Sequence, residues 1–245
     1  MQQQLSSVQI HKLKRMTLLI GMVASDGIVL TADRARVRPA SNETQMDDKM
    51  LGRKITHLEK HQVVYAVAGD DLTDAFGVAL LDALDAGSLE FGGGLERSLE
   101  GVVYRKIAEL RAKGENRPEP IERTAMVVFY GSQVSNPQLW RIRIRANPVA
   151  SRIDEIAIAG GEGNTARFFG SYYEPNLPIR RLLPLASHIV LVGHRIDSLM
   201  VEGLDSATFD SEGLHWFNED QKTPLREESK SLDALIRRRL LSESP

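Results

Sequence analysis

The chain has no cysteine among its 245 residues. That absence excludes a disulfide scaffold, a thiolate zinc site and a cysteine nucleophile. Long apolar runs are missing too, since no stretch approaches the roughly 18 residues that a membrane-spanning helix needs. The formal net charge is only −2, so no strong overall field attracts nucleic acid or an anionic membrane. We therefore expect a cytoplasmic protein that binds neither nucleic acid nor membrane.

What remains is the composition of an ordinary globular protein. Apolar residues make up 42% and charged residues 26% of the chain, enough to bury a full core. No repeat, low-complexity tract or long linker divides the sequence. Residues 1–16 lack the charged-then-apolar order of a secretory signal, and we interpret them as an N-terminal extension. We predict a single domain over residues 17–245, which is the length of one large domain.

Hydrophobic patterns predict groups of strands that alternate with pairs of helices. Residues 17–34 predict a hairpin, because Ser25-Asp26-Gly27 separates two apolar runs and glycine accepts the positive φ of a tight turn. The same reasoning predicts further strands at 54–58, 63–69, 124–131, 139–146, 154–160, 204–209 and 214–217. Helical spacing predicts helices that follow Asp71 and that span about 95–113, 164–173, 179–192 and 227–241.

This order of elements favours an α+β fold. A doubly wound parallel sheet would place single helices between consecutive strands, whereas here the strands come in clusters. Two antiparallel sheets, packed face to face between helix layers, accommodate such clusters. We predict a four-layer α-β-β-α sandwich.

The first hairpin brings a hydroxyl and a carboxylate to one end of a sheet. If the turn lies at Ser25–Gly27, Thr17 comes level with residues 34–36, and Asp33 lies within a few positions of it. The next pair of elements can deliver a lysine to the same end. Two lysines qualify, Lys49 and Lys54.

Such a trio is suited to nucleophilic catalysis. A threonine hydroxyl is a poor nucleophile alone and needs a base. If Thr17 were the first residue, its own α-amine would lie beside its Oγ1 and would titrate near neutral pH. A neighbouring lysine ammonium would lower the pKa of that amine further, and Asp33 would hold the lysine in place. The chain terminus would then take the part of the histidine in a catalytic triad.

These residues carry a resemblance to a known family. The segment TLLIGMVASDGIVLTADRA (17–35) resembles the opening of proteasome β-type subunits and their bacterial homologues, which are N-terminal-nucleophile (Ntn) hydrolases. The segment KITHLEKHQVVYAVAGDDLTDA (54–75) is similar to the family's lysine strand, its next apolar strand and its glycine-initiated helix. The sixteen-residue interval from Thr17 to Asp33 matches the family's interval. The resemblance implies the Ntn-hydrolase fold, in agreement with the sandwich predicted above.

The family's catalytic lysine has two candidates. Lys49 has the family's spacing from Thr17, while Lys54 begins the KIxxL strand and precedes Gly69 by about the family's interval. The segment RVRPASNETQMDDKMLG (36–52) looks like an enlarged family loop. Loop length is easier to change than strand register, because a register slip moves side chains to the wrong face. We therefore favour Lys54, with Lys49 as the second choice.

Further site residues follow from the resemblance alone. It implies that Asp197 completes the catalytic network and that Val67 and Asp71 line the substrate pocket. It also implies that turns containing Gly69, Gly160 and Gly161 contribute to binding the oxyanion. The chain departs from the family at two turns. Gly160 stands where the family has a serine, and Val201-Glu202-Gly203 replaces its Ser-Gly-Gly, so a hydroxyl that relays protons is missing.

The resemblance implies a threonine endopeptidase that cleaves peptides or unfolded polypeptides. Its partners would be copies of itself in a homo-oligomeric ring or double ring, together with an ATP-dependent unfoldase. It would need no cofactor and no metal. An amidohydrolase for small amides, from the wider superfamily, is an alternative.

Activity depends on the residue before Thr17. The mechanism needs a free α-amine, and processed family members normally carry glycine at the position that Met16 holds here. Translation that starts at Met16, followed by removal of that methionine, would expose Thr17. A retained extension, as in non-catalytic subunits, would instead give a structural ring protein.

Overall fold

The hairpin at the start of the chain forms as predicted. In the computed structural model, β1 (Leu18–Ala24) and β2 (Gly27–Ala32) pair antiparallel, with Ala24 opposite Gly27. A side chain at Gly27 would place its Cβ 1.9 Å from the carbonyl oxygen of Phe209 on a neighbouring strand. Glycine is therefore required here by the close approach of a second strand as well as by the turn.

The structure describes residues 17–38, 48–69, 71–114, 123–160, 164–196 and 203–241. Within them, one five-stranded antiparallel sheet has the order β10-β1-β2-β11-β12. Its remaining strands are β10 (Ile156–Gly160), β11 (Asp205–Asp210) and β12 (Gly213–Trp216). We call this the first sheet.

The second sheet is also antiparallel and five-stranded, in the order β5-β6-β7-β8-β9. Its strands are β5 (Ile55–Leu58), β6 (Val63–Ala68), β7 (Thr124–Phe129), β8 (Gln138–Arg143) and β9 (Val149–Ile153). A 3-10 turn, η1 (Glu59–His61), joins β5 to β6. A separate two-stranded ribbon pairs β3 (Ala35–Arg38) with β4 (Asp48–Leu51).

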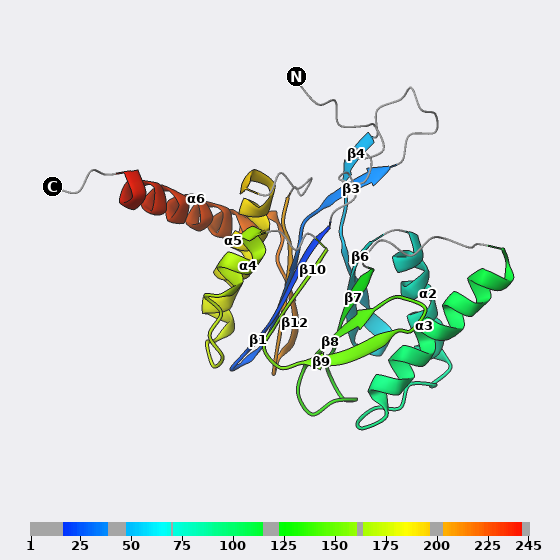
Figure 1. Cartoon of the computed structure of the whole chain (residues 1–245). Coiled ribbons are helices and arrows are strands. Elements are labelled where there is room, and N and C mark those ends of the chain that lie inside the picture. The colour runs from blue at the N-terminus through cyan, green and yellow to red at the C-terminus, as the bar shows by residue number, and fades with distance from the viewer. Residues whose placement is uncertain are drawn as a thin grey trace, which may run out of the picture.

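Helices cover the outer faces of both sheets, which gives the four layers seen in Figure 1. The second sheet is covered by α2 (Asp71–Asp85) and α3 (Leu95–Ala112), and the first by α4 (Asn164–Gly170) and α5 (Ile179–Ile196). Helix α6 (Glu219–Leu241) packs on α5 and extends away from the layer. The predicted α-β-β-α sandwich is thus confirmed.

Three apolar clusters hold the layers together. Alternate residues of β1 show how one strand serves two of them: Leu18, Ile20 and Met22 face the helices, while Leu19 faces the other sheet. All four are fully buried, and burying a side chain of this size stabilises the fold by roughly 1.5–3 kcal/mol. Because both faces of β1 are covered, its sequence is almost continuously apolar.

Three details of the secondary structure differ from the prediction. Strand β9 forms where no strand was expected, and β3 and β4 pair within a segment expected to be a loop. Helix α6 begins at Glu219, eight residues before the expected start near 227. Its start is a capping box: the Asn218 side chain accepts the Gln221 N–H at 2.9 Å, and the Gln221 side chain accepts the Asn218 N–H at 3.0 Å. Pro224 lies inside this helix.

Among the described residues, none of the helices combines the length and the apolarity that crossing a membrane requires.

Candidate active site

Three predicted site residues meet at one end of the two sheets. Thr17 precedes β1, Asp33 follows β2, and Lys54 precedes β5 of the other sheet. The Lys54 Nζ lies 2.8 Å from Thr17 Oγ1 and 2.9 and 2.8 Å from the two carboxylate oxygens of Asp33. The ammonium group therefore bridges the hydroxyl and the carboxylate.

Backbone contacts fix the carboxylate beside the threonine. Asp33 Oδ1 accepts the N–H of Leu18 at 2.9 Å, and the Asp33 N–H donates to the Leu18 carbonyl at 3.1 Å. Leu18 is the residue that follows Thr17, so the two ends of the hairpin are tied together directly at the candidate nucleophile.

The ion pair of Lys54 and Asp33 is buried. The exposed fraction of Asp33 is 0% and that of Lys54 is 7%, whereas Thr17 is only half-buried. A buried carboxylate is tolerated when hydrogen bonds and an opposite charge replace the water it lost. The charged pair is thus enclosed, whereas the threonine next to it keeps part of its surface exposed.

The two candidate lysines occupy different places. Lys49 lies in β4, paired with Val37 across the two-stranded ribbon. Lys54 precedes β5 and is the lysine that the structure brings to Thr17 and Asp33. Strands β3 and β4 lie in the connection between β2 and β5, and Lys54 is the last residue of that connection.

Gly160 contacts the backbone of the candidate nucleophile. It ends β10 opposite Leu18, and its φ is +87°. A Cβ at this position would lie 1.5 Å from the carbonyl oxygen of Thr17. The serine of the resembling family therefore has no room here, because both the backbone conformation and the contact with Thr17 require glycine.

The structure describes only some of the other residues that the resemblance implies. Gly69 follows β6 with a φ of +146°, and Ala68 before it lies beside Gly160. Val67 is half-buried and packs against the cluster beneath α2 and α3. Asp71 is the first residue of α2, but its side chain is outside the description. Asp197 and Gly161 lie outside the described residues.

The structure adds a carboxylate that the sequence did not single out. Asp205, at the start of β11, is 1% exposed, and its Oδ2 accepts the backbone N–H groups of Lys54 at 3.2 Å and of Ile55 at 3.3 Å. Lys222 of α6 lies 3.8 Å from its Oδ1. The local signal was a charged residue that opens a buried strand, but its partner is 151 residues away in the sequence.

A second ionic cluster lies next to these groups at the start of α6. Glu219 contacts Arg226 at 2.7 Å, Arg34 at 2.8 Å and Lys222 at 3.3 Å. Hydrogen bonds from Arg226 and then Lys222 lower the pKa of Glu219 from its ordinary value of 4.5 to about 2. Arg34 directly follows Asp33, so this cluster links α6 to the end of β2.

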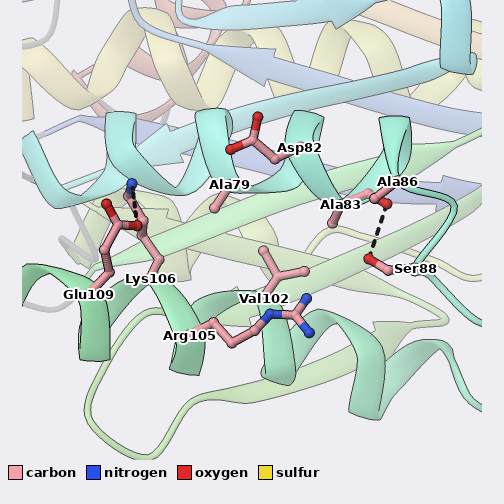
Figure 2. A pocket seen from close by; sticks show the side chains of 9 residues that line it. All are labelled: Ala79, Asp82, Ala83, Ala86, Ser88, Val102, Arg105, Lys106 and Glu109. Carbon is pink, nitrogen blue, oxygen red and sulfur yellow. Dashed lines mark hydrogen bonds and ion pairs between the residues drawn. The ribbon is translucent and has the colours of Figure 1, made fainter.

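No other feature of the described residues competes with this site. They contain no group of three or more histidine, aspartate or glutamate side chains placed to hold a metal ion. A cavity of about 310 Å³ lies between α2 and α3, as Figure 2 shows, on the outer side of the second sheet. Its lining combines three alanines with charged residues of both signs, of which Lys106 is paired to Glu109 at 3.0 Å. Neither Thr17, Asp33 nor Lys54 lines it.

The layers and strand order match the fold that the resemblance implied, an α+β sandwich of the Ntn-hydrolase type. Solved structures that share this fold include two Anbu proteins. The Anbu (Gly-1) mutant from Hyphomicrobium sp. strain MC1 superimposes with a TM-score of 0.69 at 12% identity, over 94% of this chain and 98% of that chain. Anbu (ancestral beta-subunit) from Yersinia bercovieri gives a TM-score of 0.67 at 13% identity, over 93% of this chain and 98% of that chain.

At such identities the likeness to these structures shows the fold alone. No protein-family model and no curated protein matches the chain. A function must therefore be argued from the residues of the site.

Proposed function

We propose that this chain is a threonine peptidase of the proteasome type, with Thr17 as its nucleophile once residues 1–16 are removed. One observation carries the proposal: a single lysine ammonium lies 2.8 Å from the Thr17 hydroxyl and 2.8 Å from a fully buried carboxylate. A threonine with only a structural role does not need a buried lysine–aspartate pair beside its hydroxyl. A nucleophilic threonine does, because its hydroxyl must lose a proton during the reaction.

The chemistry starts from the α-amine of Thr17. In its neutral form the amine takes the proton from Oγ1, which attacks the carbonyl carbon of the scissile peptide bond. The Lys54 ammonium stabilises the negative charge developing on Oγ1 and, by like-charge repulsion, lowers the pKa of the α-amine. Asp33 keeps Lys54 charged and in place.

Collapse of the tetrahedral intermediate completes the first half of the reaction. The C–N bond breaks, the leaving nitrogen receives the proton held by the α-amine, and the substrate acyl group remains as an ester on Oγ1. The amine then takes a proton from water, whose oxygen attacks the ester. Breaking the ester bond releases the carboxylic acid and returns a proton to Oγ1.

The substrate class follows from the mode of attack. The nucleophile is half-buried at one end of the sandwich, so a chain in extended form can reach it more readily than a folded domain. We propose peptides or unfolded polypeptides as substrates and a homo-oligomeric ring as the working form. The name "ancestral beta-subunit" of the Yersinia bercovieri neighbour supports a subunit of a larger assembly.

A specific observation favours a second function, that of a non-catalytic ring subunit. Met16 precedes Thr17 where processed members of the resembling family carry glycine. If residues 1–16 stay attached, the nitrogen of Thr17 is an amide, which cannot act as the base.

Intact mass spectrometry of the purified protein tests both functions. A chain that begins at Thr17 supports the peptidase, and a chain that keeps residues 1–16 supports the structural subunit. The matured protein is then treated with a peptide epoxyketone, which bonds to both the α-amine and Oγ1 of an N-terminal threonine. We expect one adduct per chain and none in Thr17→Ala. A chain that begins at Thr17 and forms no adduct contradicts the proposed mechanism.

A further inference from the structure

A buried ion pair outside the catalytic trio holds the segment from which Lys54 projects. Asp205 and Lys222 come from β11 and α6, and the exposed fractions of their side chains are 2% and 6%. Neither residue touches Thr17 in the contacts described above. Their position nevertheless determines where the lysine strand begins.

The first link is a backbone clamp between the two sheets. Oδ2 of Asp205 accepts the N–H groups of both Lys54 and Ile55, at 3.2 and 3.3 Å. Asp205 itself is paired with Ala32 in the first sheet, and Ala32 immediately precedes Asp33. The carboxylate therefore fixes the backbone of Lys54, which belongs to the second sheet, relative to the residue that its ammonium must reach.

The second link is a counter-charge supplied by α6. The Lys222 Nζ lies 3.8 Å from Asp205 Oδ1 and 3.3 Å from Glu219. A carboxylate this deeply buried is stable as an anion when a cation and hydrogen bonds compensate for its lost hydration. The Asn218–Gln221 capping box fixes the first turn of α6, and so places Lys222 at that depth.

We propose that Asp205 and Lys222 are positioning residues for Lys54 that act through its backbone. The start of α6 thereby contributes to the geometry of the active site, because it supplies Lys222. The expected effect on catalysis rests on the proposed function. The clamp itself is a property of the fold, and it can be measured without turnover.

The test uses Asp205→Ala, Asp205→Asn and Lys222→Met in the full chain, with Lys230→Met as the matched control. Lys230 lies on the same helix but is exposed and pairs only with Glu227 at 2.8 Å in the contacts of the described residues. Hydrogen exchange of the amides of Lys54 and Ile55 reports the clamp. We expect exchange to accelerate about tenfold or more in Asp205→Ala, the equivalent of one lost hydrogen bond, and also in Lys222→Met. Asp205→Asn keeps an oxygen acceptor and should stay near wild type, as should Lys230→Met.

Peptide hydrolysis reports the consequence. We expect kcat to fall about tenfold or more in Asp205→Ala and Lys222→Met with KM nearly unchanged, because a displaced Lys54 weakens stabilisation of the transition state and not substrate binding. Recovery of kcat in Asp205→Asn distinguishes a positioning role from a need for the negative charge. Unchanged exchange at Lys54 and Ile55 in folded Lys222→Met overturns the inference, as does faster exchange with an unchanged kcat.

The two proposals fail in different ways. If the matured wild-type chain hydrolyses no peptide, the proposed function fails. The exchange rates alone then show whether Asp205 and Lys222 hold the backbone of Lys54 and Ile55. If Asp205→Ala does not fold, Lys222→Met and the Asp205→Asn/Lys222→Met double variant carry the test. In that double variant the buried charge is removed while the acceptor remains, so protection of both amides should return.

Discussion

At the scale of single residues, Lys54 serves both stability and chemistry. Lys54→Met removes the ammonium that pairs with the buried Asp33 carboxylate, which should cost about 3–5 kcal/mol in the free energy of unfolding. Adding Asp33→Asn removes the stranded charge, so the double variant should regain most of that stability. Its peptide hydrolysis should stay at least about 10²-fold below wild type, because the ammonium beside Thr17 is still missing. Urea denaturation and initial rates measure the two effects.

Lys49→Met provides the control for that pair. Its backbone lies in the β3–β4 ribbon, so both stability and hydrolysis should stay close to wild type. A loss of activity in Lys49→Met as large as in Lys54→Met would show that the catalytic lysine has been assigned wrongly.

Gly160 makes a second prediction at this scale. Gly160→Ala would put a Cβ 1.5 Å from the Thr17 carbonyl oxygen at a φ of +87°, so we expect a loss of at least about 2 kcal/mol in the free energy of unfolding. Hydrolysis should fall as well, since the backbone of Thr17 must shift. Gly101→Ala is the control: it lies in α3 with nothing within 4 Å of its added Cβ, and it should stabilise the chain by up to about 1 kcal/mol. Thermal unfolding distinguishes the two, and equal effects would contradict the geometry at Gly160.

At the scale of elements, Glu219 links the start of α6 to the end of β2 through Arg34. Because the folded pKa of Glu219 is about 2 and its ordinary value is 4.5, the ionised form is favoured by folding. Its contribution is therefore complete above about pH 4.5 and is lost as the pH falls toward 2. We expect Glu219→Gln to lower the melting temperature at pH 7. The difference in melting temperature between this variant and wild type should become smaller as the pH falls from 4.5 to 3.

The matched control for Glu219→Gln is Glu227→Gln, which lies on the same helix in an exposed pair with Lys230. A single exposed pair contributes little to stability, whereas Glu219 contacts three cations, so the melting temperature of Glu227→Gln should follow wild type at every pH. A gap between Glu219→Gln and wild type that stays constant with pH would show that the cluster acts through packing and not through charge.

Elements also show where local sequence patterns stop being informative. The β1–β2 hairpin is specified by neighbouring residues, with Asp-Gly at the turn and apolar runs on both sides, and it forms in the predicted register. Helix α6 was predicted to start near 227, whereas the capping box at Asn218 starts it at Glu219. Pro224 is the sixth residue of this helix, beyond the first four N–H groups that a helix leaves unpaired, so the helix lacks one backbone hydrogen bond there.

At the scale of the whole molecule, the proposed function requires assembly. Size-exclusion chromatography with light scattering should give a mass several times the 27.3 kDa of one chain, with peptide hydrolysis confined to the assembled fraction. Hydrolysis by a single chain at micromolar concentration would favour a small-amide hydrolase over a compartmentalised peptidase. Thr17→Ala should assemble to the same mass as wild type, since it removes the nucleophile and leaves the surfaces unchanged.

The sequence alone was enough to predict the sandwich and the candidate trio of Thr17, Asp33 and a lysine. Strand periodicity, turn residues and the sixteen-residue interval can all be read from positions close together in the chain. Tertiary structure decided which lysine joins the trio. Lys54 arrives from the second sheet, so its distance to Thr17 depends on how two sheets pack, and no local pattern contains that distance. The same holds for Asp205 and Lys222, whose contacts close over long stretches of chain and arise only when the four layers assemble.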